Sequence, residues 1–453
     1  MLFASVLWGA PHFTAFVDVN VVPMDSETVS PHQTVVVRDD RIVAIGPVAK
    51  IKPPIGVQRI DGRGKYLMPG LTDMHVHILD PILEAAATVQ MNGNEFMAMF
   101  LANGVTSVRA MWGTQELLLL QRRVLTGDVP GPYIYSAGPV TDGDPPRWRG
   151  SRIVTTPEEA FGAVVSDKRD GFVGIKVYNR LSAESYSAIV AAARKQSMPV
   201  YGHVPRAVGL MGVLAAHQDS IEHLDGFIEA LQADDSPFRT TGQTGTSSID
   251  HIDLGKLPAL VDATRAAGAW NCPTIVVRQG LAVAPNQIPA RLARHEMQYL
   301  PAWLLALWTS QGNSRRESSD DYVRLEKQAK LSITITKALH EIGAGLLLGT
   351  DTPNPFVVPG FSIHEELENL VQAGMTPYQA LKAGTRDAAE FLKLQDEFGT
   401  VAVGRRADLL LLERNPLANV QNTGHPVGVM ARGRWFSDAQ LESQLQALAN
   451  KAN

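Results

Sequence analysis

The chain has 453 residues, of which 45% are hydrophobic and 19% are charged, the proportions of a folded protein with a sizeable apolar core. Its formal net charge of −5 provides no basic stripe for a phosphate backbone, which argues against a nucleic-acid binder and favours a small-molecule or peptide substrate. Because Cys272 is the single cysteine, an intrachain disulfide and a cysteine-rich zinc site are both excluded.

The first segment, LFASVLWGA at residues 2–10, is apolar and ends in small residues, but no basic residues precede it. It is either the tail of an export signal, which would place the protein in the periplasm or outside the cell, or the ordinary start of a cytoplasmic chain. No later run reaches the ~20 apolar residues that a membrane-spanning helix needs. We therefore predict no membrane span.

Both ends of the chain show the alternation of apolar and polar residues that is typical of short β-strands. The pattern covers residues 13–51 and returns near the C-terminus in GTVAVGRRADLLLLERNP and GVMARGRWFS. We predict a small β-sandwich domain that is built from residues 1–68 and 393–453.

Between these ends, short β-type runs alternate with longer helical patterns. The runs are GLTDMHVHI (70–78), VTSVRAMWG (105–113), PYIYSAGPV (132–140), FVGIKVY (172–178), PVYGHVP (199–205), SIEHLDG (220–226), WNCPTIVV (270–277) and GLLLGTDT (345–352). Eight such alternations predict an α/β fold, in which residues 69–392 form a (β/α)8 TIM-type barrel. The reactive groups of such a barrel lie at the carboxyl ends of its strands.

Residues 281–330 form a stretch too long for an ordinary connection between a strand and a helix. It contains YLPAWLLALW followed by SQGNSRRESSDD. One interpretation is a helical lid over the site, with Trp303 and Trp308 facing substrate. The alternative is that both tryptophans pack against a barrel helix or against the partner subunit of a homo-oligomer.

Ionisable residues recur at the carboxyl ends of the predicted strands. In an extended strand alternate side chains face the same side, so His75 and His77 can converge on one point. The later strands add a lysine, two histidines and an aspartate. Taken singly, these four are more typical of core, surface or turn positions, and their shared place in the barrel is what favours a metal site. The candidate ligands are His75, His77, Lys176, His203, His223 and Asp351.

This set of side chains predicts two divalent metal ions. Imidazole and carboxylate are the usual non-thiol ligands of zinc and similar ions. A single catalytic zinc keeps only three protein ligands, so six candidates indicate a pair of ions, with zinc the expected metal. Lysine joins such a set when its amine reacts with carbon dioxide, because the two oxygens of the carbamate can bridge two metals.

These motifs resemble the amidohydrolase superfamily, in its two-metal class with a bridging carboxylated lysine. The matching segments are PGLTDMHVH, GIKVY, GHVP, SIEHLDG and GTD, together with VRDDRIVAIGP and ADLLLLERNP near the chain ends. KVY, GHVP and SIEHLDG are similar to the imidazolonepropionase-like branch, which includes Xaa-Pro dipeptidases and ochratoxin-degrading amidases. The resemblance implies one metal on His75, His77 and Asp351, a second metal on His203 and His223, and a bridge from a carbamate on Lys176.

The predicted reaction is hydrolysis of an amide C–N bond by a metal-activated hydroxide. Asp351 would carry the proton from water to the leaving nitrogen. Tyr178 or His223 would assist at the carbonyl oxygen, although core packing is an equal interpretation of Tyr178. His364, on a predicted helix, either orients a metal ligand or serves in packing.

Three arginines are candidates to pair with a substrate carboxylate in bidentate fashion: Arg147, Arg149 and Arg278. Each lies in or beside a predicted loop at the active end of the barrel. Ordinary surface arginines are the alternative interpretation.

Three functions remain open at this stage. The leading hypothesis is cleavage of a dipeptide or an N-acyl amino acid. The second is hydrolysis of a cyclic amide or imide, as in imidazolonepropionase. The third is a non-catalytic barrel that binds a small molecule, which the presence of all six candidate ligands disfavours.

Overall fold

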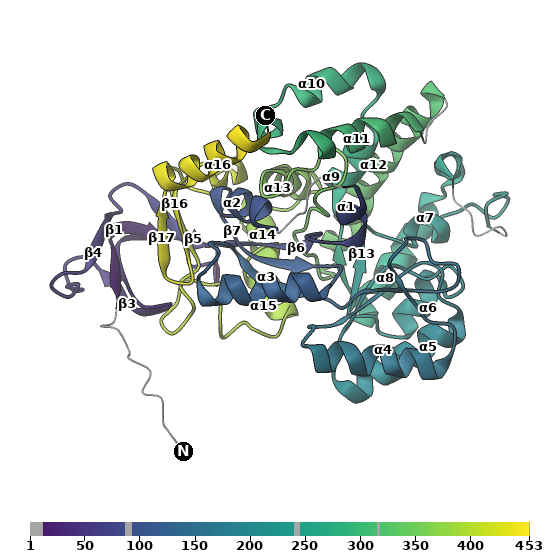
Figure 1. Ribbon diagram of the computed structural model, residues 1–453, viewed down its shortest axis with the longest axis horizontal. Helices are drawn as coiled ribbons and strands as arrows, with labels where there is room; N and C mark the ends of the chain where they lie inside the picture. The colour runs from purple at the N-terminus through teal and green to yellow at the C-terminus, as the bar shows by residue number, and fades with distance from the viewer. Residues whose placement is uncertain (1–11, 87–92, 240–244, 315–317, 453) are drawn as a thin grey trace.

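Figure 1 shows the computed structural model, which describes residues 12–86, 93–239, 245–314 and 318–452. The apolar segment at residues 2–10 lies outside the described residues. Among the described helices, none is both long and apolar enough to cross a membrane.

The two ends of the chain meet in one eight-stranded sheet, at the left of Figure 1. Its order is β17-β16-β15-β5-β1-β2-β3, with β4 paired to β1. The antiparallel pairing of β15 with β5 joins the C-terminal strands to the N-terminal ones. The strands are β1 (Phe13–Val21), β2 (Ser30–Arg38), β3 (Arg41–Pro47), β4 (Gln58–Asp61), β5 (Tyr66–Pro69), β15 (Leu409–Leu412), β16 (Pro426–Ala431) and β17 (Arg434–Ser437).

This sheet has an apolar cluster of its own, separate from the main core. Phe16, Val35 and Ile42 from the N-terminal strands pack there with Leu409 and Met430 from the C-terminal strands. The apolar residues of both chain ends are therefore buried together, which explains why the two ends carry the same alternating pattern.

The central strands form two parallel sheets, with orders β6-β7-β8 and β10-β9-β11-β12-β13-β14. Parallel strands that alternate with helices make an α/β fold, as the sequence predicts. The strands are β6 (Leu71–Val76), β7 (Val105–Ala110), β8 (Tyr133–Ser136), β9 (Val140–Asp142), β10 (Arg152–Ile153), β11 (Ile175–Val177), β12 (Val200–Gly202), β13 (Ser220–Glu222) and β14 (Trp270–Cys272).

Backbone hydrogen bonds connect the two parallel sheets at one edge. The Val173 amide donates to the Ser136 carbonyl at 2.8 Å, and the Gly138 amide donates to the Gly174 carbonyl at 2.9 Å. The residues at the end of β8 and just after it are therefore hydrogen-bonded to the residues just before β11.

Residues 345–352 connect the sheets at the other edge. The Leu347 amide donates to the Asn271 carbonyl, and the Met74 amide donates to the Leu348 carbonyl, both at 2.9 Å. Parallel bridges link the same segment to β14 and to β6. The segment thus occupies the place predicted for the last strand, although only isolated bridges mark it.

Helices surround these strands (Figure 1). At the start of α4, Thr156 and Glu159 form a capping box, in which each side chain accepts a hydrogen bond from the other residue's backbone amide. This sequence motif marks the start of a helix. The helices are α1 (Pro81–Ala86), α2 (Asn94–Ala102), α3 (Gln115–Thr126), α4 (Pro157–Asp170), α5 (Ala183–Gln196), α6 (Gly209–Ala215), α7 (Phe227–Ala230), α8 (Leu257–Ala267), α9 (Ile275–Leu281), α10 (Ile288–Leu292), α11 (Ala302–Ser314), α12 (Ser319–Glu341), α13 (Ser362–Gln372), α14 (Pro377–Ala383), α15 (Arg386–Phe391) and α16 (Asp438–Ala452).

Several predicted strands end earlier than expected, and in one of them a helix replaces the end of the strand. The run WNCPTIVV predicts a strand to residue 277, but β14 ends at Cys272 and α9 begins at Ile275. The buried Glu366 carboxylate accepts hydrogen bonds from the Ile275 and Val276 amides, at 2.8 and 2.9 Å. A distant side chain therefore caps this helix and overrides the strand preference of its β-branched residues.

The segment at 281–330 is largely helical, as expected for this stretch, and its residues 315–317 lie outside the described part of the chain. Trp308 on α11 is buried, and its indole Nε1 donates to the Pro353 carbonyl at 3.1 Å. Trp303 on the same helix is half-buried and packs against the main core. The two tryptophans therefore have different environments.

Candidate metal centre

Six side chains from five separate stretches of the sequence line one cavity of about 250 Å³. Each comes from a different position at the carboxyl end of a central strand, where parallel strands direct their reactive groups. His75 lies near the end of β6 and His77 follows it, while Lys176 lies in β11. The six are His75, His77, Lys176, His203, His223 and Asp351, the full set of predicted ligands.

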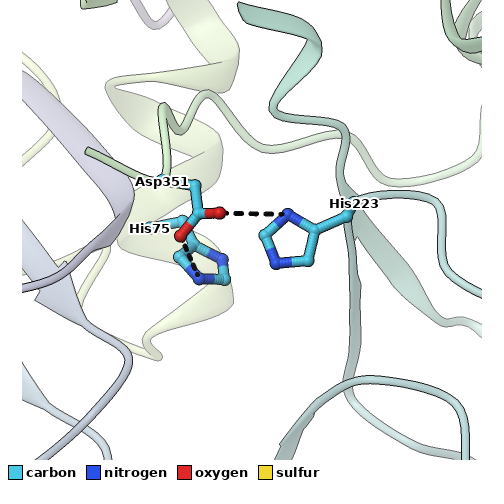
Figure 2. Close-up of side chains that lie close together, drawn as sticks. All are labelled: His75, His223 and Asp351. Atoms are coloured by element: carbon cyan, nitrogen blue, oxygen red, sulfur yellow. Dashed lines mark ion pairs between the residues drawn. The ribbon is translucent and has the colours of Figure 1, made fainter. Parts of the chain in front are cut away.

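The Asp351 carboxylate lies between two imidazoles (Figure 2). Its Oδ1 is 3.2 Å from His75 Nε2, and its Oδ2 is 3.7 Å from His223 Nδ1. One donor atom from each of these three residues lies within 4.8 Å of the others. Imidazole and carboxylate donors at this spacing are close enough to take part in one metal centre.

The remaining candidates surround this trio. His77 Nε2 is 3.0 Å from Asp351 Oδ1, and the rings of His203 and His223 have centroids 4.9 Å apart. Lys176 is 1% exposed, and its Nζ has no hydrogen-bond partner among the described residues. An ammonium group in such a place is unfavourable, because burial without a partner costs free energy.

The electrostatics of the cavity favour a bound cation. Burial lowers the pKa of His223 to about 3 and the pKa of His75 well below its usual value, so both imidazoles are in the neutral, metal-binding form. Burial also disfavours protonation of His77, but contacts with Asp351 and Asp80 outweigh it and raise the pKa to about 9. The cavity thus stabilises positive charge beside an ionised carboxylate.

The pKa of Lys176 is lowered to about 8, mainly by burial. A buried amine with this pKa is neutral far more often than a surface lysine, and the neutral amine is the form that attacks carbon dioxide. The environment of Lys176 therefore fits the chemistry of carbamate formation.

Each candidate histidine has its Nδ1 beside a second polar side chain. Such contacts fix which ring nitrogen points into a site. The pairs are His75 with Glu222 at 2.7 Å, His77 with Asp80 at 3.0 Å, His203 with Asp225 at 3.4 Å and His223 with Thr274 at 2.7 Å.

Glu222 is the most deeply embedded of these partners and is fully buried. Its other oxygen accepts a hydrogen bond from Arg109 Nη2 at 2.8 Å, and Arg109 Nε donates to the Met74 carbonyl at 2.7 Å. Burial raises the cost of charge on Glu222, but Arg109 and Lys176 outweigh it and hold its pKa below the usual value. An ionised Glu222 therefore accepts from His75 Nδ1 and leaves Nε2 free to face the cavity.

We expect Glu222→Gln to weaken metal binding by roughly 10-fold to 100-fold, because a neutral amide no longer fixes the His75 tautomer. Competition with a chelator measures this affinity. Asp167→Asn is the matched control, since Asp167 is also a buried carboxylate paired with an arginine, Arg152 at 2.7 Å, but lies outside the cavity. Equal metal affinity in Glu222→Gln and the wild type would contradict this role.

The backbone around the cavity is strained. Four non-glycine residues there have positive φ: His223 at 60°, Leu224 at 52°, Thr274 at 47° and Asp351 at 57°. This region of backbone space is uncommon for such residues and is enriched at functional sites. The strain turns the His223 and Asp351 side chains toward the same cavity.

Tyr178 follows β11 and lies in the cavity wall, with its ring centroid 4.0 Å from that of His203. Its hydroxyl accepts a hydrogen bond from Trp148 Nε1 at 2.7 Å. Burial holds the Tyr178 pKa above its usual value, so the hydroxyl keeps its proton. With its acceptor side occupied by Trp148, the hydroxyl can donate that proton to a ligand.

The three predicted arginines lie outside this cavity. Arg147 and Arg149 are exposed, and the Arg147 guanidinium stacks over the Trp148 ring at 4.4 Å. Arg278, on α9, lines a second cavity of about 480 Å³ that shares His203 with the first. Of the three, Arg278 is therefore the one whose cavity adjoins the candidate ligands.

His364 lies on α13, where its Nδ1 is 3.0 Å from Thr423 Oγ1. Neither residue lines the cavity. The contact supports the packing interpretation of His364 rather than a role in orienting a metal ligand.

The donor set fits a divalent cation. Two neutral imidazoles and a carboxylate converge on one point, and His75 Nε2 and Lys176 Nζ are buried without a hydrogen-bond partner among the described residues. A buried polar atom in this state costs about 1–3 kcal/mol, a cost that coordination removes.

Comparisons with known proteins identify relatives of this chain. Ochratoxinase from Aspergillus niger is 24% identical to this chain, over 90% of this chain and 83% of that protein. The solved structure of the bottromycin amidohydrolase AH is 27% identical, with a TM-score of 0.78, over 98% of this chain and 91% of that one. A Xaa-Pro dipeptidase solved with bound methionine has a TM-score of 0.68 at 19% identity, over 94% of this chain and 100% of that one, which shows a shared fold.

A family model described as the amidohydrolase family matches residues 66–436. The match includes the central strands, every candidate ligand and the C-terminal strands β15 and β16. The resemblance to the amidohydrolase superfamily that was inferred from the sequence is confirmed, and ochratoxinase is among the relatives. The chain belongs to the amidohydrolase family, whose members are hydrolases that act on amide bonds.

Proposed function

We propose that this chain is a binuclear metal-dependent amidohydrolase, with zinc the expected metal. His75, His77 and Asp351 would hold one ion, His203 and His223 the other, and a carbamate on Lys176 would bridge them. The observation that carries the proposal is the buried Lys176 amine, which has no hydrogen-bond partner among the described residues yet lies in a cavity lined by four histidines and an aspartate.

The proposed architecture is a (β/α)8 barrel over residues 69–392, with a β-sandwich domain from residues 1–68 and 393–453. The hydrogen bonds that join residues 345–352 to both β14 and β6 support closure of the barrel. The lid proposed for residues 281–330 is supported by α11, because Leu307 and Trp308 on this helix line the cavity. Homo-oligomerisation stays a prediction.

When bound, the two ions would supply Lewis-acid chemistry, lowering the pKa of water and polarising the substrate carbonyl. Asp351 is placed to accept the proton of the attacking water and to deliver it to the leaving nitrogen. Its Oδ2 also accepts a hydrogen bond from Asn354 Nδ2 at 2.8 Å, which fixes the orientation of the carboxylate. His223 faces the same carboxylate and would serve as a ligand with a secondary role at the carbonyl oxygen.

Tyr178 would donate its hydroxyl proton to the carbonyl oxygen as negative charge develops there. We expect Tyr178→Phe to lower kcat by about 10²-fold, the lower end of the range for loss of one such donor. Steady-state kinetics check the value, with metal content measured alongside. Tyr186→Phe is the matched control, because Tyr186 donates to Gln218 away from the cavity. An unchanged kcat in Tyr178→Phe would mean that the ring serves only in packing.

The proposed substrate is a dipeptide or an N-acyl amino acid. This class is favoured by the similarity to the solved structure of a Xaa-Pro dipeptidase. Arg278 in the adjoining cavity offers a partner for the free carboxylate of such a substrate. A cyclic amide or imide is the second candidate, favoured by the absence of an arginine among the described residues that line the metal cavity itself.

A substrate screen separates these candidates. Purified, zinc-loaded protein is assayed against dipeptides, N-acyl amino acids and hydantoin-like rings, and released amine is measured. Cleavage of linear amides supports the proposal, whereas cleavage of rings alone would replace it with the second candidate. If the protein binds metal but hydrolyses none of these compounds, the hypothesis of a non-catalytic protein that binds a small molecule would be favoured.

A further inference from the structure

Besides the candidate metal ligands, a set of largely apolar side chains lines the metal cavity and forms a wall. Three tryptophans contribute to it from three different parts of the chain: Trp112 after β7, Trp148 between β9 and β10, and Trp308 on α11. Most of the other side chains that line the cavity are apolar: Ile82, Leu83, Val140, Leu281, Leu307, Pro353 and Pro355. The polar Asn354 also lines it, and its Nδ2 donates to Asp351 Oδ2.

Two of the tryptophans have their polar atom already satisfied by the protein. Trp148 Nε1 donates to the Tyr178 hydroxyl at 2.7 Å, and Trp308 Nε1 donates to the Pro353 carbonyl at 3.1 Å. Because an indole has a single donor and no acceptor, these residues offer a ligand only the surfaces of their rings. A ligand group that needs hydrogen bonds gains none from them.

The wall is also uncharged. Apart from the candidate metal ligands, the described residues that line the cavity include two ionisable side chains. Asp80 lies 3.0 Å from His77, and the raised pKa of Tyr178 keeps its phenol neutral. A charged ligand group against the three tryptophans would lose its hydration without gaining a partner from them. The group that fits is therefore neutral and apolar.

The size of the cavity narrows the choice further. A cavity of about 150 Å³ with apolar walls holds one benzene ring. At about 250 Å³, this cavity takes one such ring and leaves space for the scissile amide and the metal ions. Flat rings gain from indole surfaces at offset or edge-on contact, an advantage that a saturated group of the same size lacks.

We propose that the tryptophan wall, formed by Trp112, Trp148 and Trp308, is a subsite for an uncharged, single-ring aromatic group next to the scissile amide. This inference rests on the proposed amidohydrolase function and names its substrate class. It goes beyond the general dipeptide or N-acyl amino acid, because it requires an aromatic ring on one side of the bond.

Binding of neutral probes tests the subsite without turnover. Titration calorimetry on zinc-loaded protein compares benzamide with cyclohexanecarboxamide, which has the same non-hydrogen skeleton but no aromatic face. We expect benzamide to bind at least about threefold more tightly, and Trp308→Leu to weaken its binding by about tenfold. Trp303→Leu is the matched control, since Trp303 lies on the same helix and packs against the core instead of lining the cavity.

A second variant covers the case in which Trp308→Leu does not fold. Trp148 is half-buried and lies in a loop, so Trp148→Leu alters the wall with less loss of core packing. Thermal melting verifies that each variant is folded. Equal affinity for the two probes, or benzamide affinity that is unchanged in every folded wall variant, would overturn the inference.

Hydrolysis assays separate failure of the subsite from failure of the proposed function. The substrates are two matched pairs, N-benzoylglycine with N-acetylglycine and glycylphenylalanine with glycylalanine. We expect the aromatic member of one pair to have at least about a tenfold higher kcat/KM. Hydrolysis with equal kcat/KM within both pairs would overturn the subsite and leave the amidohydrolase. No hydrolysis, with benzamide binding that still depends on Trp308, would overturn the proposed function and support the subsite.

Discussion

Lys176→Ala is expected to lower amide hydrolysis by more than about 10²-fold, because the variant lacks the amine that would form the bridge between the two metals. Loss of even an outer partner of a metal ligand costs 10-fold to 100-fold, so loss of a bridging ligand should cost more. Short carboxylic acids should restore part of the activity, since a free carboxylate can occupy the space of the missing carbamate. Turnover with and without added propionate measures both effects.

Lys168→Ala is the control for this substitution, because Lys168 is an exposed lysine on α4. It should retain full activity and show no response to propionate. Full activity in Lys176→Ala would contradict the bridging role. A loss that propionate does not restore would indicate instead that the lysine supports the cavity in another way.

Asp351→Asn is expected to lower kcat by roughly 10²-fold to 10⁴-fold, the usual contribution of a positioned proton carrier. The fold should persist, because asparagine is one of the few residues that tolerate the positive φ of 57° at this position. Asn354 Nδ2, which donates to Asp351 Oδ2 at 2.8 Å, can still donate to an amide oxygen in the variant. Steady-state kinetics and thermal melting together separate chemistry from stability.

Asp167→Asn is again the control, because it removes a buried carboxylate outside the cavity. It should lower thermal stability and leave kcat of the folded protein unchanged. Normal turnover in Asp351→Asn would mean that another group carries the proton.

The positions of the six candidate ligands could be predicted from the sequence because strand ends are locally encoded. An apolar run of alternating residues predicts a buried strand, and parallel strands direct their carboxyl ends to the same side of a sheet. His75, Lys176 and Asp351 could therefore be placed in one cavity although the first and the last differ by 276 in sequence number.

The partners of these ligands were not predictable in the same way. Arg109 lies within β7 and Glu222 within β13, and only the tertiary fold brings them together beneath His75. Glu222 directly precedes His223 in SIEHLDG. This carboxylate next to a candidate ligand is the one feature of the sequence that points to a partner of the ligands. The start of α9 was missed for a similar reason, because Glu366 caps it from α13.

The C-terminal helix α16 (Asp438–Ala452) shows a different limit. The predictions treat this end of the chain as part of a β-rich domain, but the described residues after β17 form a helix. Its Leu441, Leu445 and Ala449 are buried at four-residue spacing, the pattern of one apolar helix face. That pattern was present in the sequence, but the strands before it dominated the prediction.

The central claim is that six side chains gathered at one end of the parallel strands bind a pair of divalent ions. Elemental analysis of the purified protein, grown with added zinc and bicarbonate, tests it most directly. The account predicts close to two metal equivalents per chain in the wild type and fewer in Lys176→Ala. A wild-type protein that binds no metal under these conditions would contradict it.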